Sequence, residues 1–255
     1  MEPITRRRFL LMTAAGLGGF ALWQRRPDDP VPTAAPVSTT VTTSGPLPTT
    51  TTMPATTTTT RPPVALEVIG REGWGARPPV AEYGTHTIDH LTVHHTSVIL
   101  TDNRLAPARL RGHQAYHQEQ GWADLAYHFA IDRDGNVYEA RPYSAPGDTF
   151  TNYDPAGHFL PVLEGNYSEQ EPTDRQLESL VLLLAWASAE FGVDPATIGG
   201  HRDYAATTCP GDRLYASIGD GSIGRRVQER LDSGGVALTY ALGEAALARV
   251  AGIEA

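Results

Sequence analysis

The sequence contains no lysine and only one cysteine. All 20 basic residues are arginines, and from Pro62 to the C-terminus there are 14 arginines against 26 aspartates and glutamates, a net charge of −12. Because a surface this acidic repels polyanions, we expect no nucleic-acid partner and no attraction to an anionic bilayer. The lone Cys209 also excludes a disulfide within the chain.

The N-terminal apolar run is short. It covers 15 residues from Phe9 to Trp23, fewer than the roughly 20 that a transmembrane helix needs. The run follows the arginines of Thr5-Arg-Arg-Arg-Phe-Leu-Leu11, a motif typical of a twin-arginine export signal. The alternative is an ordinary secretory signal. We therefore predict that residues 1–25 are a twin-arginine signal or anchor of an exported protein, either secreted or associated with the cell wall or membrane.

No small-x-small cleavage site follows this run closely, so a cleaved signal and a retained anchor both stay open. An uncleaved N-terminal anchor is the only membrane contact that we expect. Residues 26–65 have few large apolar side chains and are rich in Thr and Pro. Such a composition cannot offset the entropy of ordering, so it predicts a disordered linker.

Residues 66–232 predict a single α/β domain, expected to be monomeric, with a central mixed β-sheet flanked by helices. Local patterns predict its elements: strands at 90–95, 125–131, 137–140 and 159–163, and helices at 104–120, 177–191 and 223–231. Thr173 and Gln176 are typical of a helix N-cap, and Gly192 of a helix end. Residues 67–77 predict an irregular entry segment, and residues 233–255 a C-terminal helical extension.

Three separated residues suggest a metal site. His94 ends an apolar strand, and His201 lies eight residues before Cys209. Two imidazoles and one thiolate suit Zn²⁺, whose catalytic sites leave the fourth position to water. Taken singly, each residue is more typical of a packed core, but an exported protein gains little from a spare thiol unless that thiol binds a metal.

A competing metal pair is His113 and His117, four residues apart on one predicted helix. The familiar helical zinc pair has Glu directly after its first His, whereas here Gln114 follows, and no third ligand is suggested. We therefore expect both histidines to line a groove or to face solvent.

Several motifs together resemble the type 2 N-acetylmuramoyl-L-alanine amidases and the peptidoglycan recognition proteins. They are His94-His-Thr96, Gly121-Trp-Ala-Asp-Leu-Ala-Tyr-His-Phe129, Asp134-Gly-Asn-Val-Tyr-Glu-Ala-Arg141, Gly200-His-Arg202 and Thr207-Thr-Cys-Pro-Gly211. The resemblance extends from about Arg71 to Leu231, and five motifs in the family's order are far more specific than any one of them.

The resemblance implies zinc held by His94, His201 and Cys209, with Tyr127 and Thr207 as catalytic residues beside the metal. It also implies bacterial cell-wall peptidoglycan as the substrate. The residues expected to line the substrate groove are Thr96, His117 and Trp122, with His95 at its edge. His95 and His128 neighbour His94 and Tyr127 on strands and should face the opposite side.

Two departures from the family are visible. Residues 145–149 stand where many members carry Gly-Ala-His, and Val162 stands where some bacterial members have a general-base Glu. Glu164, two residues later on the same strand face, is a candidate substitute for that base.

The expected function is therefore zinc-dependent hydrolysis of the amide between the muramoyl lactyl group and L-alanine. Two alternatives stay open. One is a non-catalytic peptidoglycan-binding module, and the other is a zinc hydrolase that acts on a different amide.

Overall fold

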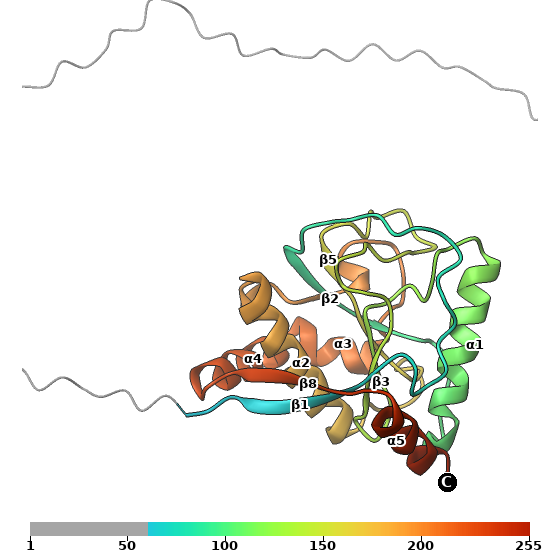
Figure 1. The fold of residues 1–255 in the computed structure, drawn as a ribbon. Coiled ribbons are helices and arrows are strands. Elements are labelled where there is room, and N and C mark those ends of the chain that lie inside the picture. Colours follow the sequence, from blue (N-terminus) through green and yellow to red (C-terminus); the bar gives the residue numbers. More distant parts are fainter. Residues whose placement is uncertain (1–60) are drawn as a thin grey trace, which may run out of the picture. The chain divides into compact units, whose positions relative to one another are not determined.

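The computed structural model describes residues 61–255, and Figure 1 shows this part of the chain as a coloured ribbon. The predicted signal over residues 1–25 and the predicted linker up to residue 60 lie outside the described residues. Within residues 61–255, no helix has both the length and the apolar character that a membrane span requires.

The domain is built on a mixed β-sheet, which confirms the predicted fold class. Its strands lie in the order β5-β2-β6-β3-β4-β1-β8, with β7 paired to β2, and only the β3–β4 hairpin is antiparallel. The strands are β1 (Val64–Ile69), β2 (His90–His95), β3 (Phe129–Ile131), β4 (Val137–Glu139), β5 (His158–Phe159), β6 (Pro161–Leu163), β7 (Gly199–Gly200) and β8 (Val236–Ala241).

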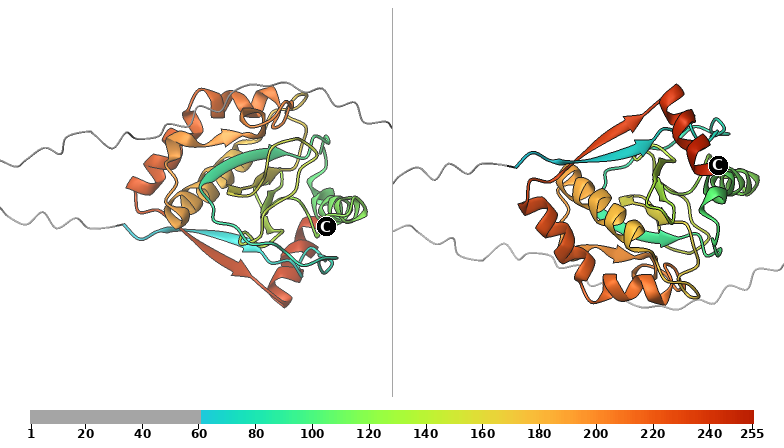
Figure 2. Two further views of the ribbon diagram at one scale, coloured as in Figure 1. Left: turned by 90° about the horizontal axis from the view of Figure 1, so that it is seen from above. Right: turned by 90° about the horizontal axis from the view of Figure 1, so that it is seen from below.

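Helices pack on the sheet. They are α1 (Ala106–Glu119), α2 (Asp174–Phe191), α3 (Asp212–Gly219), α4 (Ser222–Asp232) and α5 (Glu244–Glu254), with short 3-10 helices at Asn103–Leu105, Pro195–Thr197 and His201–Asp203. In the two views of Figure 2, α2 (yellow-orange) crosses the sheet, and α1 (green) lies on the side of the domain away from α2.

The sheet separates two hydrophobic cores. Alternate strand residues point to opposite faces, so Val137 of β4 packs with Leu180 and Leu184 of α2, whereas its neighbour Tyr138 packs with Leu110 of α1. The same alternation places Leu163 of β6 in the α2 core and Val162 in the α1 core.

Helix α2 confirms the capping prediction. The Thr173 side chain accepts a hydrogen bond from the Gln176 N–H (3.1 Å), and the Gln176 side chain accepts one from the Thr173 N–H (3.2 Å). Gly192 ends the helix in the left-handed conformation at φ 69°, which glycine adopts without a steric penalty. Local chemistry therefore fixes both ends of α2.

Two predictions at the ends of the domain were wrong. Residues 64–69 form β1, although the linker was predicted to extend to residue 65 and an irregular segment to begin at residue 67. Residues 236–241 form β8 rather than part of a helix. The strands pair in parallel along six residues, from Val64–Val236 to Ile69–Ala241. Because this pairing joins segments about 170 residues apart, no local pattern could indicate it. The tail is helical only in α5.

A third prediction was too long. The strand expected at 125–131 begins only at Phe129. Before Phe129, side chains rather than a neighbouring strand form hydrogen bonds with the backbone. His117 Nδ1 accepts from the Ala126 N–H (3.1 Å), and Arg141 Nε donates to the Leu125 carbonyl (2.8 Å).

Candidate metal centre

Parallel pairing brings the two histidines together. Strand β2 ends at His94 and His95, and its neighbour β7 pairs with it through Val93 and Gly200, so His201 emerges beside His94. Both side chains are buried, and their ring centroids lie 4.6 Å apart.

Cys209 returns to the same point on the loop after the short helix His201–Asp203. Gly200 permits this approach, because a Cβ there would lie 2.8 Å from Pro210 Cδ. The His95 backbone N–H lies 3.4 Å from Cys209 Sγ and donates to it. The sulfur is thereby directed toward His94 rather than into the core.

The three predicted ligands fit one metal ion. Their ligand atoms all lie within 4.8 Å of one another, and they are the one such group of His, Cys, Asp or Glu among residues 61–255. Cys209 Sγ and His94 Nδ1 are 3.6 Å apart, close to the ~3.5 Å that tetrahedral zinc imposes between a sulfur and a nitrogen ligand. The other ring nitrogen, His94 Nε2, is buried without a hydrogen-bond partner.

Electrostatics also favour a cation here. Burial lowers the pKa of His201 to about 4 and holds that of His94 well below its usual value, so both rings are neutral ligands at pH 7. Burial raises the pKa of the Cys209 thiol to about 12. Its thiolate therefore needs a nearby positive charge, which a bound metal supplies.

A groove of about 410 Å³ opens from this centre, between α1 and the loops that carry the ligands. The sequence-predicted site residues are brought together along it: His94, His201, Cys209, Tyr127, Thr207, His95, Thr96, His117 and Trp122. The groove is large enough for a peptide segment or a small ligand.

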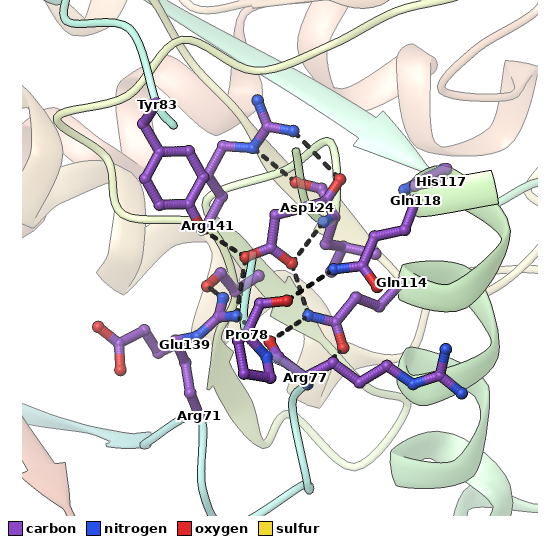
Figure 3. A network of polar contacts seen from close by, with 12 residues as sticks. Arg71, Arg77, Pro78, Tyr83, Gln114, His117, Gln118, Asp124, Glu139 and Arg141 are labelled. Atoms are coloured by element: carbon purple, nitrogen blue, oxygen red, sulfur yellow. Dashed lines mark hydrogen bonds and ion pairs between the residues drawn. The ribbon is translucent and has the colours of Figure 1, made fainter. Parts of the chain in front are cut away.

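Tyr127 is positioned by the turn that joins α1 to β3. Buried Asp124 is the centre of this turn: it pairs with Arg71 (2.7 Å), accepts from Gln114 of α1 (2.6 Å) and from Tyr83 (2.5 Å), as Figure 3 shows. Arg141 donates to the Asp124 carbonyl (3.1 Å). These contacts fix the path of residues 124–127 against α1.

The Tyr127 ring packs 5.2 Å from that of His94, and burial raises the pKa of its hydroxyl. The hydroxyl therefore stays protonated and is a hydrogen-bond donor. Thr207 Oγ1 accepts from the Cys209 N–H at 3.2 Å, which leaves its own proton for another partner.

The remaining groove residues have contacts of their own. His95 Nδ1 accepts from the Tyr167 N–H (3.2 Å), and burial lowers the pKa of His95 and of His117 to about 4. The His117 and Trp122 rings lie 4.8 Å apart. The expectation that His95 and His128 face away from the site holds for one of them: His95 lines the groove. His128, which precedes β3, is buried outside the groove with Nε2 2.9 Å from the Ala145 carbonyl.

The competing pair, His113 and His117, is not a metal site: both line the groove, but neither joins a ligand cluster. In the segment that departs from the family, Asp148 pairs with Arg141, and Asp148 and Thr149 line the groove.

Three further residues of the site were not predicted from the sequence, and all of them lie in the loop after Thr149. Thr151 Oγ1 lies 2.8 Å from His201 Nε2 and orients that ring. Tyr153 packs 5.0 Å from His201, and exposed Phe150 packs 4.3 Å from Trp122 at the groove mouth. No local pattern marks this loop, since its contacts depend on the folded chain.

Comparisons with known proteins agree with this geometry. The family described as N-acetylmuramoyl-L-alanine amidase (Amidase_2) matches residues 84–212. Peptidoglycan-recognition protein SC2 of Drosophila melanogaster is 30% identical over 159 residues, 61% of this chain and 86% of that protein. The human N-acetylmuramoyl-L-alanine amidase is 34% identical over 154 residues, 56% of this chain but only 26% of that protein.

Among solved structures, peptidoglycan recognition protein-LE in complex with tracheal cytotoxin, a monomeric diaminopimelic acid-type peptidoglycan, superposes with a TM-score of 0.55 at 26% identity. The match covers 60% of this chain and 92% of that one. The chain therefore belongs to the N-acetylmuramoyl-L-alanine amidase family, together with the peptidoglycan recognition proteins.

Proposed function

We propose that this protein is a zinc-dependent amidase that hydrolyses the bond between the muramoyl lactyl group and L-alanine in peptidoglycan. One observation carries the proposal: the candidate ligand set His94, His201 and Cys209 converges in a groove that Tyr127 also lines, with its ring packed on His94. Binding of peptidoglycan by a similar recognition protein supports the choice of substrate.

A zinc ion held by these ligands would acidify water and polarise the scissile carbonyl. Hydrolysis also needs a donor to the developing oxyanion and a proton for the departing amine of L-alanine. Tyr127 is suited to the first task because its hydroxyl stays protonated, and Thr207 supports it with a free hydroxyl proton. His117, Trp122 and Thr96 form groove walls that would hold the substrate.

Export is part of the proposal. The twin-arginine motif at Arg6 and Arg7 would carry the protein to the compartment in which peptidoglycan lies. The acidic, lysine-free composition disfavours a polyanionic target.

The test is digestion of purified sacculi by the purified full chain, with mass spectrometry of the products. We expect muropeptides cleaved at the lactyl–alanine amide, and loss of this activity on chelation or in Cys209→Ser. Turnover that survives both treatments would remove zinc from the proposal. Binding of muropeptides without any product would instead favour a recognition module, and cleavage of a different amide would redefine the substrate.

A further inference from the structure

A buried carboxylate lies beneath the groove wall. Glu164 directly follows β6, and because Val162 pairs with His94, residue alternation places Glu164 on the same sheet face as the metal ligands. Its side chain is 0% exposed, and Oε1 lies 3.5 Å from His113 Nε2 on α1 without a hydrogen bond. Oε2 has a single long contact, 3.4 Å from the Thr96 hydroxyl.

A carboxyl group at such a place needs a polar partner, since burying an unpaired polar group is costly. His113 is the one group within ion-pair distance of Glu164 among residues 61–255. Its ring is 22% exposed and lines the groove, so the pair reaches the groove through His113.

The other groove histidines differ. None of them has a carboxylate within ion-pair distance, whereas His113 does. No arginine is found among the described residues that line the groove, and the lining acid Asp148 is already paired with Arg141. His113 is therefore the one groove histidine that is backed by a buried carboxyl group.

We infer that His113, backed by buried Glu164, binds a carboxylate of the stem peptide of the substrate. This inference rests on the proposed function. In this inference Glu164 is a positioning residue, because it lies behind His113 and Thr96 rather than on the groove surface. The pair would favour peptides with free carboxylates over amidated ones.

The experiment compares a muramoyl tetrapeptide that has free peptide carboxylates with the same compound amidated. For the full chain loaded with zinc, we measure kcat and KM for both substrates, and also their affinities by calorimetry in Tyr127→Phe. A charge-assisted hydrogen bond contributes about 1.5–3 kcal/mol, so we expect a roughly tenfold or greater preference for the free carboxylates, expressed in KM. His113→Gln and Glu164→Gln should each abolish this preference while the amidated substrate is still cleaved.

Two controls separate folding from recognition. His90→Gln changes a histidine at the opposite end of β2, outside the groove, and should keep the preference. The double variant His113→Leu, Glu164→Met replaces the pair with apolar residues, which cores commonly tolerate. It should fold, as thermal unfolding would show, and should lack the preference.

The outcomes are distinguishable. Equal cleavage and equal affinity for both compounds in the wild type would overturn the inference and leave the amidase proposal standing. If neither compound is cleaved, the amidase proposal fails, and the calorimetric preference still decides the inference. A preference that survives in both single variants would also overturn it.

Discussion

At the scale of single residues, the candidate metal centre combines two imidazoles and a thiol whose charge states burial affects differently. Burial keeps His94 and His201 neutral, whereas it would keep the Cys209 thiol protonated. A divalent cation reconciles the three, because it requires neutral imidazoles and stabilises a thiolate. Tyr127 adds a hydroxyl that burial keeps protonated.

Removal of that hydroxyl should affect chemistry more than structure. In Tyr127→Phe the ring still packs on His94, but the oxyanion loses a donor, so we expect kcat to fall about 10²–10³-fold with zinc content unchanged. Steady-state kinetics and metal analysis check this. Tyr240→Phe, an exposed tyrosine on β8, is the matched control. Full activity in Tyr127→Phe would exclude Tyr127 from the chemistry.

At the scale of secondary structure, the sequence predicted the elements whose ends and turns depend on neighbouring residues. The β3–β4 hairpin, the capped helix α2 and strand β2 follow from turn residues, caps and apolar runs. Strands β1 and β8 did not, because they form by pairing with each other across most of the chain. The candidate ligands His94, His201 and Cys209 could be predicted because they stand in recognisable motifs. Thr151 and Tyr153 reach the site only through the folded loop.

The C-terminal helix offers a matched test of its packing. Val250 of α5 is 4% exposed in the α1-side core, and Leu247 on the same helix is 55% exposed. Val250→Asp buries an unpaired charge and should lower the free energy of unfolding by about 3 kcal/mol. Leu247→Asp should change it by less than about 0.5 kcal/mol. Urea denaturation measures both, and equal effects would show that α5 does not pack there in solution.

At the scale of the whole molecule, all nine histidines lie within the domain, and several are buried and neutral. Burial lowers the pKa of His117 and His158 to about 4 and that of His128 to about 3. Unfolded histidines titrate near 6.5. Between these values the unfolded chain binds more protons than the folded one, so stability falls as the pH falls.

We therefore expect the zinc-free domain to lose stability steadily from pH 6.5 toward pH 4, starting above the range in which unfolded carboxylates titrate. Urea midpoints at pH 7, 6 and 5 in the presence of chelator measure this. His128→Leu should reduce the slope, because it removes one of these titrations. A midpoint that stays constant or rises between pH 7 and pH 5 would contradict the burial of neutral histidines.

Zinc X-ray absorption spectroscopy of the purified full chain tests the metal centre most directly. We expect one zinc per chain, bound by one sulfur at about 2.3 Å and two imidazole nitrogens at about 2.0 Å, with the sulfur shell lost in Cys209→Ser. A zinc shell without sulfur, a third imidazole, or no bound zinc would contradict a centre formed by His94, His201 and Cys209.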